Sequence, residues 1–142
     1  MNDARIIVDG GTINTHPGRM YGAFRTIIHT TTEGITTTYQ TKPIKVVTDL
    51  FGDCNQAEFL AALYGVKNLE KQIVSMGLDP REYSVHIVSD SKNMVYQTRG
   101  EWNIRSDIIQ ALRERLQDRL DNFRFYYLRW VPRKIIYSEL GC

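Results

Sequence analysis

The chain has 142 residues, of which 42% are hydrophobic and 24% are charged, with a formal net charge of +2. This length and composition are typical of one globular domain, so residues 1–142 are expected to form a single domain. No apolar run approaches the ~18 residues of a membrane span, and the first residues lack a signal-peptide layout. Cys54 and Cys142 offer neither a metal-binding spacing nor a disulfide framework, which favours a reducing compartment.

The charges are unevenly distributed along the chain. Residues 91–142 contain ten Lys or Arg against six acids, whereas residues 54–90 contain three bases against five acids. A basic C-terminal third beside an acidic stretch suits a polyanion held next to bound cations. The plainer explanation, ordinary solvated helix surfaces, stays open.

In chain order, the first half is predicted to be mostly strand. An apolar run at residues 5–11 ends in Gly-Gly and is typical of a buried strand. Segments 19–32 and 34–48 are rich in Thr, Tyr, Ile and Val and suggest antiparallel hairpins. A helix then runs from about residue 56 to residue 76, where glycine and proline end it.

The second half alternates strands with helices. A strand is predicted at residues 84–90, a short helix at 91–98, and a last strand at 123–131. Ser106 caps a second long helix, whose apolar stripe comprises Ile108, Ile109, Leu112, Leu116 and Leu120. The order β-β-β-α-β-α-α-β predicts an α/β fold. It has a mixed five-stranded sheet, the first three strands antiparallel, with helices on its faces.

Glu58 stands near the start of the first long helix. The commoner explanation is a capping box, with Asn55 as the N-cap and Glu58 three residues later. Glu58 also shares a helix face with small residues at spacings of three, four and seven, namely Ala61, Ala62 and Gly65. Because the side chains of this face are small, the helix can lie close to another element, and the Glu58 carboxylate would then lie close to that element too.

Three acids occupy equivalent places in the predicted fold. Asp9 ends the first strand, Asp90 ends the fourth strand, and Glu58 begins the helix between them. Ligands of open α/β sheets bind at the carboxyl ends of strands. Each acid alone is better explained as a turn or cap residue, but their convergence costs about 4 kcal/mol per pair at ~4 Å and an effective dielectric of 20. Divalent cations offset that cost, and oxygen ligands favour Mg²⁺ or Mn²⁺ over zinc.

Four motifs resemble type 1 ribonuclease H in order and spacing. They are IIVDGG, NQAEFLAALYGV, VHIVSDSKNMVYQTRGEW and RWVPR, and the resemblance runs from about Arg5 to Arg133. It implies a ribonuclease H-like fold in a short form without the basic protrusion. It also implies an endonuclease that hydrolyses the RNA strand of RNA/DNA hybrids and leaves 5′-phosphate and 3′-hydroxyl ends. The family uses two Mg²⁺ ions on four carboxylates, so Asp9 would bridge both ions, with Glu58 and Asp90 as further ligands.

The fourth carboxylate is the largest departure from the family pattern. Its usual register, about ten residues beyond Trp130, falls on Leu140, and Glu139 is the nearest acid. Glu139 is the candidate fourth catalytic metal ligand. The alternatives are a site that works with three acids or one with impaired activity. The chain is also expected to lack the family's C-terminal helix.

The resemblance also implies a substrate surface. Contacts with 2′-hydroxyls would come from Gly10, Gly11, Asn55 and Gln56, and contacts with the DNA strand from Trp102, Arg99 and Arg105. Trp102 is equally consistent with a core position, and Trp130 is interpreted as core. Cys54 replaces an asparagine that the family often has. Arg133 and Lys134 are interpreted as solvated tail charges.

Two other classes of function stay open. One is a non-catalytic ribonuclease H-like module that binds nucleic acid or a partner protein, and the other is a DNA-directed nuclease of the same fold. The three retained acids favour an enzyme, and NQAEFLAALYGV favours ribonuclease H. The expected partner is an RNA/DNA hybrid, with no membrane association, a cytoplasmic location and a monomeric state. Two Mg²⁺ ions are the expected cofactors, with Mn²⁺ as a substitute.

Overall fold

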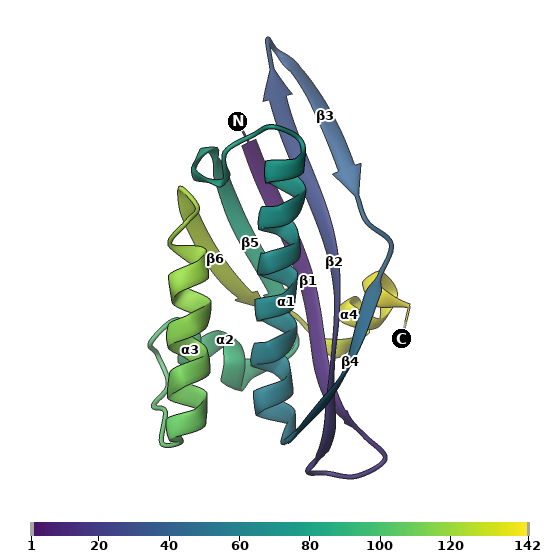
Figure 1. Cartoon of the computed structure of the whole chain (residues 1–142), viewed down its shortest axis with the longest axis vertical. Coiled ribbons are helices and arrows are strands. Elements are labelled where there is room, and N and C mark those ends of the chain that lie inside the picture. The colour runs from purple at the N-terminus through teal and green to yellow at the C-terminus, as the bar shows by residue number, and fades with distance from the viewer. Residues whose placement is uncertain (1, 142) are drawn as a thin grey trace.

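The computed structural model describes residues 2–141 as a mixed sheet with helices on both faces (Figure 1). Met1 and Cys142 lie outside the described residues. The elements are β1 (Asn2–Ile13), β2 (Gly18–Thr32), β3 (Ile35–Gln40), β4 (Ile44–Gly52), α1 (Cys54–Ser75), a 3₁₀ turn (Pro80–Glu82), β5 (Tyr83–Ser89), α2 (Lys92–Thr98), α3 (Asp107–Leu120), β6 (Phe125–Trp130) and α4 (Arg133–Leu140). None of the helices in residues 2–141 is both long and apolar enough to span a bilayer.

The sheet has the predicted mixed topology but six strands instead of five. Its order is β3-β2-β1-β5-β6, and β4 also pairs with β2. The pairs among β1 to β4 are antiparallel, whereas β5 joins β1 and β6 in parallel. The expected third strand is divided because Pro43 has no N–H to donate to a ladder. Thr41 lies between β3 and β4, and its hydroxyl accepts a hydrogen bond of 2.9 Å from the Thr26 amide.

The main core lies between the sheet and the pair of helices α1 and α3. Alternate residues of β1, β5 and β6 point into it, among them Ile6, Ile87 and Leu128. The buried stripe of α3 comprises Ile109, Leu112, Leu116 and Leu120, as predicted. The prediction that Ile108 belongs to this stripe is wrong, because Ile108 lies in the first turn of α3 and is 59% exposed.

Helix α1 lies directly on the strands through its small residues. A Cβ added to Gly22 of β2 would lie 2.9 Å from the Cα of Ala61, and one added to Gly65 would lie 2.7 Å from a methyl carbon of Ile6. Real Cβ atoms do not approach this closely, so only glycine allows this packing. The close approach predicted for the face that carries Glu58 is confirmed.

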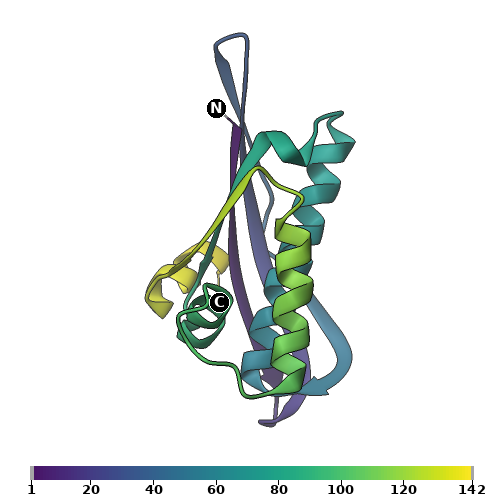
Figure 2. The same cartoon turned by 90° about the vertical axis from the view of Figure 1, so that its left-hand side faces the viewer.

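The opposite face of the sheet is covered only in part, by α4 (Figure 2). Ile136 and Leu140 of α4 form a small second core with Ile7, Ala23, Val88 and Val131. The expectation that the chain lacks a C-terminal helix is therefore wrong. The helix begins after Pro132, whose backbone is already extended, and ends at Gly141 in the left-handed conformation with φ 71°.

Candidate active site

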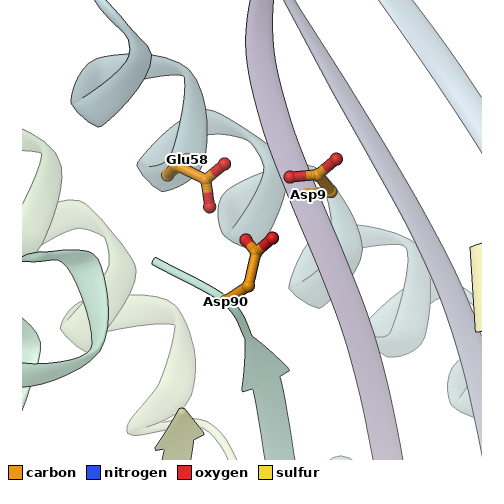
Figure 3. Close-up of side chains that lie close together, drawn as sticks. All are labelled: Asp9, Glu58 and Asp90. Carbon is orange, nitrogen blue, oxygen red and sulfur yellow. The ribbon is translucent and has the colours of Figure 1, made fainter. Parts of the chain in front are cut away.

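The fold brings three acids together where β5 ends beside β1 (Figure 3). The expectation that Asp9 ends the first strand is wrong, because β1 continues to Ile13. One oxygen from each of Asp9, Glu58 and Asp90 lies within 4.8 Å of the corresponding oxygens of the other two. The register of β1 and β5, in which Ile7 pairs with Val88, places Asp9 beside the end of β5 that carries Asp90. Glu58 reaches the same point from the second turn of α1. The convergence predicted from the sequence is thus present in the structure.

Glu58 is held by the sheet and not by its own helix. Its side chain is buried, and Oε1 accepts a hydrogen bond of 2.8 Å from the Gly10 amide. Oε2 accepts one of 3.3 Å from the Ser89 hydroxyl. Ser89 comes immediately before Asp90 and was missed in the sequence. Glu58 is therefore fixed by both strands that carry the other two acids.

The predicted capping box of Asn55 and Glu58 is wrong. The N-cap is Asp53, whose carboxylate accepts a hydrogen bond of 2.8 Å from the Gln56 amide. Gln56 completes the box by accepting a bond of 3.2 Å from the Asp53 amide. Because the helix begins earlier than predicted, its end is capped without Glu58. The Glu58 carboxylate is thus available to the acid cluster.

The three acids strongly influence one another. Burial raises the pKa of Glu58 well above the usual range, and the neighbouring Asp9 raises it further. Burial and Asp90 also raise the pKa of Asp9. The Gly10 amide opposes both shifts without cancelling them. Such a crowded, all-oxygen donor set suits Mg²⁺ or Mn²⁺, which would neutralise the charges in place of protons.

Asp90 is fastened by the segment that leads into α4. Arg133 donates from Nε to Asp90 Oδ2 at 3.2 Å, with the Asp90 side chain 5% exposed and that of Arg133 70% exposed. The Trp130 indole N–H donates to the Asp90 carbonyl at 3.1 Å. Trp130 is partly buried against the core, as interpreted from the sequence. Arg133 is exposed as expected, but it is not merely a solvated charge.

Glu139 is not brought to the acid cluster. Its carboxylate pairs with the Arg25 guanidinium at 2.8 Å on the sheet face under α4. Leu140, at the register of the family's fourth acid, is 5% exposed and belongs to the second core. The helical turn that buries Leu140 directs Glu139 towards β2. As a fourth ligand, Glu139 remains a prediction without support from its position.

A cavity of about 190 Å³ adjoins the acids. Its lining includes Glu58 and Asp90 together with Gly10, Cys54, Asn55, Ser91, Asn93 and Arg133. Two predicted substrate residues, Gly10 and Asn55, are therefore at the site. The Asn55 amide nitrogen donates to Gln97 at 3.2 Å, while its Oδ1 is buried without a hydrogen-bond partner among residues 2–141. Ser91 and Asn93 were missed, although both follow Asp90 closely in the sequence.

The other predicted substrate residues lie outside this lining. Gly11 faces the Tyr21 ring, and Gln56 is engaged in the capping box. Trp102 is 44% exposed and packs on Tyr96, with ring centroids 5.1 Å apart. Two exposed arginines flank it along the chain, Arg99 paired with Glu101 at 2.6 Å and Arg105 in the loop before α3. Arg99 and Trp102 both pack on the Tyr96 ring, and Arg105 follows Trp102 by three positions along the chain. We call these three residues the patch after α2.

Comparison with known proteins identifies the fold. No protein-family model and no curated protein matches the sequence. Many solved structures nevertheless share its fold, three of which follow. The N-terminal RNase H domain of a Mycobacterium tuberculosis protein has a TM-score of 0.65 at 21% identity, covering 98% of this chain and 93% of that one. RNase H1 from Halobacterium salinarum has a TM-score of 0.69 at 17% identity, covering 98% and 92%. LC11-RNase H1, in complex with an RNA/DNA hybrid, has a TM-score of 0.64 at 18% identity, covering 96% and 90%. The chain therefore has the ribonuclease H-like fold that its motifs predict.

Proposed function

We propose that this protein is an endonuclease that hydrolyses the RNA strand of RNA/DNA hybrids. The observation that carries the proposal is the cluster of Asp9, Glu58 and Asp90, with ligand atoms within 4.8 Å of one another on a ribonuclease H-like fold. The solved complex of LC11-RNase H1 with an RNA/DNA hybrid supports the choice of substrate. A binding module that takes up no cations has no use for three crowded acids, two of which, Asp9 and Glu58, have raised pKa values.

The three acids would hold two Mg²⁺ ions, for which Mn²⁺ is a substitute. When bound, such ions activate the attacking water and stabilise the leaving 3′ oxygen, which gives 5′-phosphate and 3′-hydroxyl ends. Asp9 would serve both ions. The Gly10 amide and the Ser89 hydroxyl orient Glu58, and Arg133 neutralises Asp90 in the absence of metal. Glu139 could serve as a fourth ligand only after its ion pair with Arg25 is broken.

The substrate would enter over the cavity beside α1. Gly10 and Asn55 are placed to meet 2′-hydroxyls, which distinguish RNA from DNA. Gly11 and Gln56 remain predicted contacts that their positions do not support, because Gly11 faces Tyr21 and Gln56 is engaged in the capping box. The DNA strand would lie against the patch of Trp102, Arg99 and Arg105. We propose that the chain acts as a single domain, as a monomer and in the cytoplasm.

One cleavage experiment tests the proposal. Labelled RNA/DNA hybrid, double-stranded RNA, double-stranded DNA and single strands are each incubated with Mg²⁺, Mn²⁺ or EDTA. We expect cutting of the RNA strand of the hybrid alone, and only with a divalent cation. Preferential cutting of DNA would identify a DNA-directed nuclease of this fold. Binding of the hybrid without cutting at any metal concentration would identify a non-catalytic module.

A further inference from the structure

Part of the sheet face that carries α4 has no helix over it in the described chain (Figure 2). It belongs to the first halves of β1, β5 and β6, where alternate residues point away from the main core. Ala4, Val85 and Tyr126 point into that core, so their neighbours along the strands point outwards. We call the surface formed by Asp3, Arg5, Ser84, His86, Phe125, Tyr127 and Arg129 the open sheet face.

Aromatic and basic side chains stand side by side across the open sheet face. Arg5 pairs with His86 in the β1–β5 register, and His86 pairs with Tyr127 in the β5–β6 register. The His86 and Tyr127 rings have centroids 5.4 Å apart. Phe125 lies two residues before Tyr127 on the same face. Phe125 is 60% exposed and Tyr127 is 43% exposed, so both rings reach the surface. The Arg99 guanidinium lies over the Tyr127 ring, 5.4 Å from its centroid, so a base stacked on Tyr127 would also lie beside Arg99.

The open sheet face is hollowed between the side chains of its neighbouring strands. A cavity of about 260 Å³ is lined by residues of β1, β2, β5 and β6, including Arg5, His86, Phe125 and Tyr127. Burial lowers the pKa of His86, and Arg129 and Arg5 lower it further, so the imidazole is largely neutral near pH 7. Its Nε2 has no hydrogen-bond partner among residues 2–141. Because that nitrogen is buried, the hollow presents chiefly the flat faces of the rings.

The charge around the hollow is predominantly positive. Arg5 and Arg129 are exposed on the open sheet face. Arg124, just before β6, donates to the Ser84 hydroxyl at 3.2 Å. Against these three arginines, the open sheet face as defined above carries one acid, Asp3. The complementary ligand is therefore a polyanion with flat rings between its charges. An acidic peptide has a flat ring only where an aromatic residue stands between its acids, whereas a nucleic acid has one for every phosphate. A second copy packed through the same face would place arginines close to arginines.

We propose that the open sheet face binds single-stranded nucleic acid. Bases stack on Phe125, Tyr127 and His86, while the arginines contact the phosphates. Successive bases on aromatic side chains beside a basic track are the usual means of holding a single strand without sequence preference. Duplexes hide their base faces and bind there only through charge. The proposal does not depend on cleavage or on metal.

This surface is distinct from the acid cluster. Asp90 lies four positions after His86 along the strand direction, which is about 13 Å at ~3.3 Å per residue. The open sheet face contains none of Asp9, Glu58 or Asp90, and its lining shares no residue with the cavity beside them. Binding to it can therefore be measured in EDTA.

Fluorescence anisotropy with labelled oligo-dT and oligo-U in EDTA tests the proposal on the full chain. We expect Phe125→Ala and Tyr127→Ala each to weaken binding by about 5- to 150-fold, the range for losing one stacked base. Tyr39→Ala is the matched control, because Tyr39 is 40% exposed but pairs with Ile28 and so lies on the other sheet face. Similar affinity for the two oligonucleotides is expected, and a strong preference for one of them would contradict binding by stacking and charge alone.

A second pair of variants tests the phosphate contacts. Arg5→Gln is expected to reduce the salt dependence of binding, whereas Arg115→Gln, exposed on α3, is expected to leave it unchanged. Circular dichroism confirms that each variant is folded. The proposal fails if Phe125→Ala and Tyr127→Ala bind like the parent, or if Tyr39→Ala loses as much. It also fails if Phe125→Ala and Tyr127→Ala weaken the binding of heparin as much as they weaken the binding of the oligonucleotides, because heparin has charge but no bases to stack.

Discussion

The Nε atom of Arg133 lies 3.2 Å from Oδ2 of Asp90, although 43 positions separate the two residues in the sequence. A permanent monovalent cation thus sits on one of the three clustered acids. The guanidinium has to share or leave this carboxylate when a divalent cation binds there. Arg133 is therefore placed to set how readily the site takes up metal.

Replacing Arg133 tests this competition directly. We expect Arg133→Gln to tighten Mn²⁺ binding by about two- to five-fold, since an exposed ion pair contributes at most about 1 kcal/mol. Isothermal titration calorimetry measures the affinity without any cleavage. Lys134→Gln is the control, because Lys134 is an exposed neighbour of the same charge. Unchanged or weaker Mn²⁺ binding by Arg133→Gln would contradict competition.

Removing one clustered charge should separate catalysis from stability. We expect Asp9→Asn to abolish cleavage of an RNA/DNA hybrid while its binding survives, because phosphate contacts come mainly from other residues. The metal-free variant should be as stable as the parent or slightly more so, because repulsion with Glu58 and Asp90 is relieved. Single-turnover cleavage and melting in EDTA measure the two effects. A clearly lower melting temperature in EDTA would identify Asp9 as a structural residue instead.

The raised pKa of Glu58 predicts a pH dependence of metal-free stability. Its folded-state pKa lies above the ordinary value of 4.5, so the folded state binds a proton that the unfolded chain releases. The resulting stabilisation is full below pH 4.5 and is lost as the pH rises through the raised pKa. Lowering the pH from about 8 to about 5 should therefore stabilise the parent relative to Glu58→Gln. Urea unfolding in EDTA measures the difference, and parallel pH profiles would show that Glu58 does not titrate.

Metal binding should show the opposite dependence on pH. The ligands must lose their protons to bind a cation, so Mn²⁺ affinity is expected to rise with pH until Glu58 and Asp9 are ionised. Calorimetry in two buffers of different ionisation enthalpy counts the protons released. Release of no proton near pH 6 would mean that the cluster is already ionised without metal.

The position of Glu139 predicts a structural effect of its replacement. Glu139→Gln removes the ion pair with Arg25, whose side chains are 24% and 33% exposed, so stability should fall by less than about 1 kcal/mol. Arg25→Gln should cost a similar amount, and neither variant should slow cleavage strongly. A ten- to hundred-fold slower single-turnover rate for Glu139→Gln alone is typical of a supporting metal-site interaction. That result would establish Glu139 as the fourth ligand.

The sequence predicted those features whose signals are local and periodic. The strands, the two long helices and the meeting of Asp9, Glu58 and Asp90 followed from apolar patterning and strand ends. The N-cap was misplaced because Asp53 and Asn55 are both good caps, and only packing on β1 and β2 decides between them. Helix α4 was missed because it is short and has no side-chain cap. The pairing of Arg133 with Asp90 depends on that helix and has no local signal.

The three acids come from segments that are brought together only by the finished sheet. Gly10 and Glu58 are 48 positions apart, and Asp90 follows a strand that joins β1 in parallel. During translation the ribosome must therefore release the chain beyond β5 before the cluster can exist. A partly synthesised chain that ends before Asp90 carries Asp9 and Glu58 but no complete set of acids. The proposed cleavage activity can therefore arise only after the chain has been synthesised at least as far as Asp90.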